Sequence, residues 1–223
     1  NQRNIELIKK IRLVNETINF RSKMYESIKR EQKDDLKILD IGCSSRQFSP
    51  FLKEIANEYI TADINNFEGI DIVFDLCDSS TISKDLHGKF NHIIALAILE
   101  HVWQPFYAAE NLVKLLDRSK KSKLWLYAPF LLAYHAPKTL EYQDYFRYTR
   151  DSWAILFPEA KTITISPVRG RFTTALNLAI PSYKSIFETK FRSLGKIIKF
   201  ADKFYSSDSN KYQVSGYNVI IEY

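Results

Sequence analysis

The sequence predicts an α/β fold in which helices cover both faces of a mostly parallel β-sheet. Short apolar runs alternate with segments of about 10–15 residues whose apolar positions recur every three or four residues, which is typical of βαβ units. The apolar runs are almost uninterrupted, as expected for parallel strands that are buried on both faces.

Seven apolar runs have the length and composition of strands. The first ends at Gly42, which permits a tight turn, and the fifth is stopped by Pro129, which cannot continue a hydrogen-bonded ladder. The predicted strands cover residues 36–41, 59–63, 70–75, 92–97, 124–128, 162–165 and 217–221. Helices are predicted between them over residues 47–57, 105–116 and 149–157.

Helical periodicity also marks the two ends of the chain. One helix is predicted over residues 5–28, so residues 1–35 are expected to form an N-terminal helical cap on a domain of residues 36–223. Before the last strand, residues 170–214 are predicted to be a helical insertion. Residues 186–204 within it are amphipathic, which favours either packing on the core or contact with a membrane surface or an acidic partner.

Composition narrows the class of protein. The chain has 223 residues, 45% hydrophobic and 26% charged, which is typical of a globular protein with a full core. Two cysteines, Cys43 and Cys77, exclude a disulfide scaffold and predict a reducing, cytoplasmic environment. No apolar run reaches the roughly 18 residues of a membrane span. The four histidines and two cysteines show no metal-ligand spacing, so no metal site is predicted.

The predicted site lies where the parallel strands end, because ligands of open α/β sheets bind beyond the carboxyl ends of the strands. Gly42 lets the backbone approach a ligand, and Asp63 follows 21 residues later, where a carboxylate can accept hydrogen bonds from both ribose hydroxyls. Asp75 can accept from the exocyclic amine of adenine, and the N–H of Leu76 can donate to a ring nitrogen. The alternative is that each acid caps a strand end or a helix. Without a phosphate-binding glycine motif, the pattern suits an adenosine that carries no pyrophosphate.

Several of these residues resemble motifs of the class I, Rossmann-like, S-adenosylmethionine (SAM)-dependent methyltransferases. Residues 39–43, Leu-Asp-Ile-Gly-Cys, resemble the first motif of that family, and residues 99–102, Leu-Glu-His-Val, resemble its signature after strand four. Asp63 and Asp75 fall where the family has its ribose and adenine contacts. Residues 128–149 are similar to a lid segment of one branch, which includes many enzymes of small-molecule and surface-sugar biosynthesis.

The resemblance implies a Rossmann-like three-layer αβα sandwich with a seven-stranded, mostly parallel sheet and an antiparallel last strand. It also implies SAM as the cofactor, with an acceptor bound under a lid of residues 130–148. The candidate bases near that acceptor are His135, His101 and Asp144, of which histidine titrates near neutral pH. The implied cofactor-binding residues are Asp40, Gly42, Cys43, Ser44, Asp63, Ile64, Asp75, Leu76 and Ala97.

We therefore expect transfer of a methyl group from SAM to a hydroxyl or amine of a small-molecule, sugar or lipid acceptor. A net charge of +6 keeps an RNA methyltransferase as an alternative, although it does not require a nucleic-acid partner. Ser44 and Arg46 stand where the first motif usually has glycines. A second alternative is therefore a non-catalytic binding module with a methyltransferase-like fold. A NAD-dependent oxidoreductase would share the fold, but its pyrophosphate-binding glycines are missing from the sequence.

Overall fold

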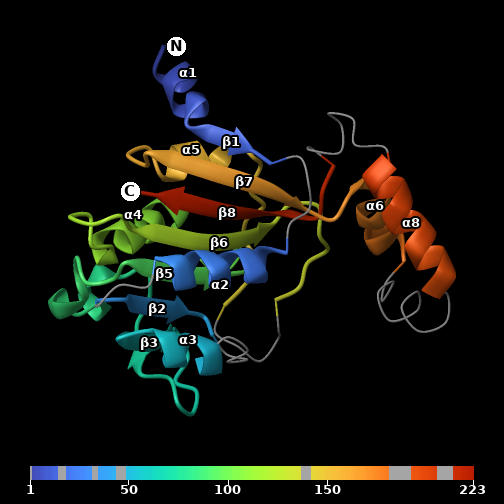
Figure 1. The fold of residues 1–223 in the computed structure, drawn as a ribbon. Coiled ribbons are helices and arrows are strands. Elements are labelled where there is room, and N and C mark those ends of the chain that lie inside the picture. The colour runs from blue at the N-terminus through green and yellow to red at the C-terminus, as the bar shows by residue number, and fades with distance from the viewer. Residues whose placement is uncertain are drawn as a thin grey trace.

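A computed structural model describes residues 2–14, 19–31, 35–43, 49–136, 142–180, 192–204 and 213–223. One sheet runs through the molecule in the order β1-β7-β8-β6-β5-β2-β3-β4 (Figure 1). Its strands are β1 (Ile11–Leu13), β2 (Lys37–Ile41), β3 (Glu58–Asp63), β4 (Ile72–Val73), β5 (His92–Leu96), β6 (Lys123–Pro129), β7 (Thr162–Val168) and β8 (Gly216–Glu222). The helices are α1 (Gln2–Lys9), α2 (Phe20–Arg30), α3 (Ser49–Ile55), α4 (Pro105–Leu115), α5 (Ser152–Leu156), α6 (Arg171–Ala179) and α8 (Arg192–Phe204).

The sheet confirms the predicted fold class. All neighbouring strands are parallel except β8, which lies antiparallel between β6 and β7. The sheet has eight strands rather than the seven predicted, because residues Ile11–Leu13 pair with β7 as an additional edge strand.

The single helix predicted over residues 5–28 is wrong. Helix α1 ends at Lys9, the chain then extends along the edge of β7, and α2 begins after Asn19, whose side chain accepts a hydrogen bond from the Ser22 N–H. The backbone N–H of Val14 donates to the Ile165 carbonyl at 2.9 Å, which continues the pairing with β7. This pairing satisfies backbone groups of both strands at the sheet edge, so tertiary contact overrides the helical spacing of the isoleucines. The division into a cap and a larger domain remains a prediction.

Apolar side chains pack on both faces of the sheet, which explains the uninterrupted apolar runs. Consecutive residues of β2 point to opposite faces: Leu39 packs in the cluster that includes Leu112 of α4, and Ile38 packs with Met24 of α2. Figure 1 shows α2 on the near face of the sheet. The result is the predicted three-layer αβα arrangement.

The strand order reverses between β2 and β5, where ligands of open α/β sheets are expected to bind in a crevice beyond the strand ends. From β2 the chain proceeds outward to β3 and β4, and it then returns to form β5 and β6 on the other side of β2. Connections leave the sheet in opposite directions at such a reversal, and the space beyond the carboxyl ends of the two strands is where ligands bind in open α/β sheets.

Helices α6 and α8 belong to the predicted insertion and stand beyond one end of the sheet in Figure 1. Asp202 of α8 accepts hydrogen bonds from the first turn of α6, including one of 2.7 Å from the Phe172 N–H. Ile197 and Phe200 of α8 are exposed, at 61% and 67%. Contact of residues 186–204 with a membrane or an acidic partner remains a prediction. None of the helices in the described ranges is both long and apolar enough to traverse a bilayer.

Candidate active site

Two residues with left-handed backbone conformation follow the adjacent strands β2 and β5. Gly42 has φ of 70° and Ala97 has φ of 59°. The left-handed region is uncommon for a residue with a Cβ, and such conformations cluster at functional sites. A Cβ on Gly42 would also lie 1.9 Å from Cδ1 of Ile98, so a larger residue would have to displace that side chain as well as adopt a strained φ. The structure therefore brings two predicted cofactor-binding residues together at the crevice.

Asp40 precedes this turn and is buried within β2. Its carboxylate accepts a hydrogen bond of 2.6 Å from the Tyr59 hydroxyl, and its residue exposure is 3%. Burial raises the pKa of Asp40 to about 6, and the Tyr59 hydrogen bond opposes the rise. The Tyr59 hydrogen bond thus does not offset the cost of burying the ionised carboxylate, which is therefore suited to bind a cation.

Asp63 ends β3 beside the crevice and keeps one carboxylate oxygen available. Its Oδ1 atom accepts from the backbone N–H of Asn65 at 2.9 Å and from the Asn65 side-chain amide at 3.3 Å. Its Oδ2 atom accepts no hydrogen bond from a residue that the structure describes. The next residue, Ile64, is 41% exposed. One free carboxylate oxygen beside a partly exposed apolar side chain fits the ribose of a nucleoside.

Asp75 follows β4 and uses part of its carboxylate to close its own turn. Its Oδ1 atom accepts a hydrogen bond of 2.7 Å from the Cys77 N–H. Leu76 is buried, and its carbonyl accepts from the Asn111 side-chain amide at 2.9 Å. Asp75 and Leu76 lie just beyond the carboxyl end of β4. The Oδ1 atom of Asp75 caps its own turn, which is the alternative interpretation of this acid.

The turn after Gly42 is only partly described. Cys43 is buried, at 7% exposure. Ser44 and Arg46 lie in residues 44–48, outside the described residues, so the structure does not place them.

A second group of polar side chains gathers after β5, where residues 99–101 form a single 3-10 turn. Two of the candidate bases, His101 and His135, lie beside Glu100, and the third, Asp144, lies beside His135. Glu100 is part of the Leu-Glu-His-Val motif and was not predicted as a site residue. Nε2 of His135 lies 3.6 Å and Nε2 of His101 lies 3.8 Å from Oε1 of Glu100. Nδ1 of His135 lies 3.1 Å from Oδ2 of Asp144.

The segment predicted as a lid brings this cluster together. The backbone N–H groups of Tyr145 and Phe146 donate to the Glu100 carbonyl at 2.8 and 3.1 Å, and the Tyr148 hydroxyl donates to the Leu99 carbonyl at 2.7 Å. These contacts cover Glu100, whose residue exposure is 0%. No sequence signal gave this burial, because the covering residues lie far along the chain. Closure of residues 130–148 as a lid remains a prediction.

Asp144 is held by Arg147, which binds it through two nitrogens of the guanidinium. The Arg147 hydrogen bond lowers the pKa of Asp144 to about 2, against the opposing effect of burial. The Glu100 carboxylate raises the pKa of His135 from its usual value, partial desolvation opposes this, and the charge of Asp144 adds to the rise. Arg150 pairs with Asp151 at 2.8 Å.

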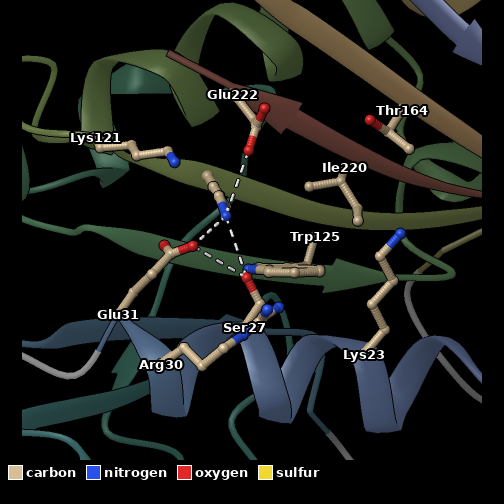
Figure 2. A pocket seen from close by; sticks show the side chains of 10 residues that line it. Lys23, Ser27, Arg30, Glu31, Lys121, Trp125, Thr164, Ile220 and Glu222 are labelled. Atoms are coloured by element: carbon tan, nitrogen blue, oxygen red, sulfur yellow. Dashed lines mark hydrogen bonds and ion pairs between the residues drawn. The ribbon is translucent and has the colours of Figure 1, made fainter.

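A pocket of about 420 Å³ lies elsewhere, between α2 and the strands β6, β7 and β8 (Figure 2). No described residue of the predicted site lines it. The Lys123 ammonium contacts Ser27, Glu31 and Glu222, so the polar groups at the centre of the pocket satisfy one another. The lining residues are Lys23, Ser27, Arg30, Glu31, Lys121, Lys123, Trp125, Thr164, Ile220 and Glu222.

Comparison with known proteins identifies the fold. No protein-family model matches the sequence, and no curated protein matches it. Among solved structures, a SAM-dependent methyltransferase from Archaeoglobus fulgidus is similar, with a TM-score of 0.52 and 15% identity over 91% of this chain and 94% of that one. The chain has the fold of the class I SAM-dependent methyltransferases.

Two further structures of that fold are about twice as long as this chain. Phosphoethanolamine N-methyltransferase 2 from Haemonchus contortus, solved with phosphomonomethylethanolamine and S-adenosylhomocysteine, has a TM-score of 0.52 and 9% identity over 90% of this chain and 52% of that one. The CMeT domain of citrinin polyketide synthase has a TM-score of 0.50 and 10% identity over 84% of this chain and 46% of that one. One is a phosphoethanolamine methyltransferase and the other is a domain of a polyketide synthase, so the shared fold does not define the acceptor.

Proposed function

We propose that the protein is a SAM-dependent methyltransferase that acts on a hydroxyl or amine of a small-molecule, sugar or lipid acceptor. The observation that carries the proposal is the pair of left-handed residues, Gly42 and Ala97, at the ends of adjacent strands beside the free carboxylate oxygen of Asp63. A crevice of this kind would fit a nucleoside, and one similar solved structure, the phosphoethanolamine N-methyltransferase 2, carries S-adenosylhomocysteine in the same fold.

The chain's own residues would bind the cofactor along the carboxyl ends of three strands. Asp63 would hold the ribose hydroxyls through its free oxygen, and Ile64 would pack against the nucleoside. Asp75 and Leu76 are proposed beside the adenine, and Asp40 beside the cationic methionine end. When bound, SAM supplies a methyl group that its sulfonium already activates, so the protein mainly positions the two reactants and excludes water.

The acceptor is proposed to lie beside His101 and His135, beneath residues 130–148. Asp144 is the weakest of the three candidate bases, because Arg147 binds both its oxygens and lowers its pKa to about 2. We assign it instead to positioning His135, with which it shares two contacts: the His135 N–H donates to its Oδ2 atom at 3.0 Å, and Nδ1 of His135 lies 3.1 Å from the same oxygen.

Calorimetry with S-adenosylhomocysteine tests the cofactor proposal. The wild type is expected to bind, and Asp63→Ala to bind about 10- to 100-fold more weakly, because a hydrogen bond to a charged group contributes about 1.5–3 kcal/mol. Asp85→Ala is the matched control, since this exposed carboxylate lies on a 3-10 turn away from the crevice. An unchanged affinity in Asp63→Ala removes Asp63 from the site.

A non-catalytic binding module is the second candidate. The observation that favours it is the turn of Asp75, whose first oxygen already accepts from Cys77, together with the Ile98 side chain packed against Gly42. Wild-type protein that fails to bind S-adenosylhomocysteine at millimolar concentration would support this candidate. For an RNA acceptor, favoured only by the net charge of +6, the discriminating result is binding that weakens steeply with salt.

A further inference from the structure

Glu100 is buried without the partners that a buried carboxylate requires. Its exposure is 0%, and neither carboxylate oxygen accepts a hydrogen bond within the part of the chain that the structure describes. The nearest basic atoms are Nε2 of His135 at 3.6 Å and Nε2 of His101 at 3.8 Å, beyond ordinary hydrogen-bond distance. Burying a carboxylate in this way is strongly unfavourable unless a cation compensates it.

Both histidines direct Nε2 toward Glu100 because their Nδ1 atoms are engaged elsewhere. Nδ1 of His101 lies 2.7 Å from the Gln143 carbonyl oxygen, and Nδ1 of His135 lies 3.1 Å from the Asp144 carboxylate. These oxygens only accept, so Nδ1 carries the hydrogen in each ring, and Nε2 of a neutral ring then presents a lone pair. One ligand atom each from Glu100, His101 and His135 therefore converges within 4.8 Å of the others.

We propose that Glu100, His101 and His135 bind one divalent transition-metal ion, which in turn binds the oxygen of the methyl acceptor; the second part rests on the proposed function. Two imidazoles and a carboxylate are a ligand set typical of Zn²⁺ and other first-row metals, whereas Mg²⁺ prefers oxygen ligands. Bonds of about 2.1 Å place neighbouring ligands of a tetrahedral site about 3.4 Å apart. The separations of 3.6 and 3.8 Å therefore need only a small contraction.

The surrounding contacts support a metal site rather than a chance cluster. A metal-binding histidine usually donates its other N–H to a carboxylate or carbonyl, which fixes the ring and its tautomer. The Ala133 carbonyl, 3.3 Å from Nδ1, does this for His135, and the Gln143 carbonyl does it for His101. The Asp144 carboxylate, held by Arg147, lies 3.1 Å from the same His135 nitrogen. The sequence predicted no metal site because His135 is brought to Glu100 by folding and not by local spacing.

The location also suggests the chemistry. Glu100 follows Ala97 by one turn at the carboxyl end of β5, so the site adjoins the proposed cofactor crevice. Three protein ligands leave an open coordination position, and a hydroxyl bound there loses its proton more readily. Its oxygen then forms a bond to the methyl carbon while the carbon–sulfur bond breaks; the proton goes to water and S-adenosylhomocysteine leaves. The inferred acceptor is thus a hydroxyl compound.

Metal titration of the full chain tests this inference without any measurement of activity. Chelator-stripped protein is titrated with Zn²⁺ by calorimetry and with Co²⁺ by visible absorption, in the absence of cofactor. We expect one ion per chain, visible Co²⁺ bands, and a rise in melting temperature with Zn²⁺. Glu100→Gln and His135→Ala should weaken binding by about 100-fold or more, since changes even to outer partners cost about 10- to 100-fold. His87→Ala, an exposed histidine, is the matched control and should bind as the wild type does.

Three results overturn the inference: no Zn²⁺ or Co²⁺ binding by the wild type, equal binding by Glu100→Gln, or binding of Mg²⁺ alone. Should His135→Ala fail to fold, the isosteric Glu100→Gln variant decides the question by itself. S-adenosylhomocysteine binding, measured on the same samples, separates the two proposals. Cofactor binding without metal binding overturns the metal site alone, whereas metal binding without cofactor binding overturns the methyltransferase and leaves the metal site in place.

Discussion

The two ends of β5 carry buried charged clusters that differ in how completely they are paired. At the amino end, Lys123 is buried and its ammonium contacts Ser27, Glu31 and Glu222. At the carboxyl end, Glu100 is buried and, among the described residues, accepts no hydrogen bond. Three partners are the full donor capacity of a lysine, so the first cluster is complete by itself.

His92 illustrates the completeness of the amino-end cluster. Its Nδ1 atom accepts a hydrogen bond of 3.0 Å from the Trp125 indole, and Nε2 lies 3.7 Å from Glu31. Burial lowers the pKa of His92 to about 4, although the Glu31 charge opposes this. A histidine whose pKa burial lowers to about 4 and whose Nδ1 atom is hydrogen-bonded is a structural group. By contrast, His101 and His135 present Nε2 atoms to a carboxylate that has no other partner.

Hydrogen bonds and ion pairs within a cluster, more than burial or residue type, distinguish a structural cluster from a candidate site. Both clusters combine histidine, carboxylate and a cation, and both are covered by chain from distant parts of the sequence. A cluster that satisfies itself has nothing left to bind, whereas an unsatisfied one retains a binding capacity that folding alone would not preserve.

The largest expected effect is at the amino-end cluster. Lys123→Met should lower the free energy of unfolding by about 3 kcal/mol, because it leaves Glu31 and Glu222 facing each other without a cation. Urea unfolding measures the effect, and Lys121→Met, an exposed lysine two residues away, is the control. If Lys123→Met lowered the free energy of unfolding by less than Lys121→Met does, this cluster would contribute little to stability.

The next effect is a difference in pH dependence between Asp40 and Glu31. The pKa of Asp40 rises from 3.8 to about 6 on folding, so its contribution to stability is complete below about pH 4 and is lost as the pH rises through 6. Asp40→Asn should therefore exceed the wild type by about 2–3 kcal/mol near pH 8 and by less near pH 5, as measured by urea unfolding at each pH.

Glu31 should show the opposite dependence on pH. Burial raises its pKa, but the hydrogen bond and charge of Lys123 more than offset this and bring the pKa below its usual value. The contribution of Glu31 to stability is present above the pKa of the unfolded state and disappears as the pH falls.

The outcome that would contradict the prediction for Asp40 is a stability of Asp40→Asn that follows the same pH profile as the wild type. It would mean that the burial of the Asp40 carboxylate does not raise its pKa.

The smallest expected effect distinguishes Glu100 most directly from Lys123. In chelator-treated buffer, Glu100→Gln should keep the free energy of unfolding or raise it by up to about 1 kcal/mol, because it removes a buried charge that lacks partners. Thermal and urea unfolding measure this against Glu110→Gln, an exposed carboxylate of α4. A loss comparable to that of Lys123→Met would place both clusters in the same structural class.

Much of the fold was predictable because it depends on local pattern. The apolar runs gave β2 through β8 near their observed positions, and Pro105 begins α4 as expected. The edge strand β1 was missed, since its pairing with β7 comes from residues far along the chain. The positions of Gly42 and Asp63 at strand ends were predictable for the same local reason, although the roles assigned to them remain proposals.

The sequence by itself determined where strands end and which acids, glycines and histidines stand there, because apolar periodicity and turn chemistry act over a few residues. Only the tertiary structure decided which of these groups are buried and paired. Residues 142–148 fold back over the turn after β5 and help bury Glu100, and Asp144 among them contacts His135, which lies beside Glu100. Desolvation and hydrogen bonding depend on such contacts between distant segments, which no local pattern encodes.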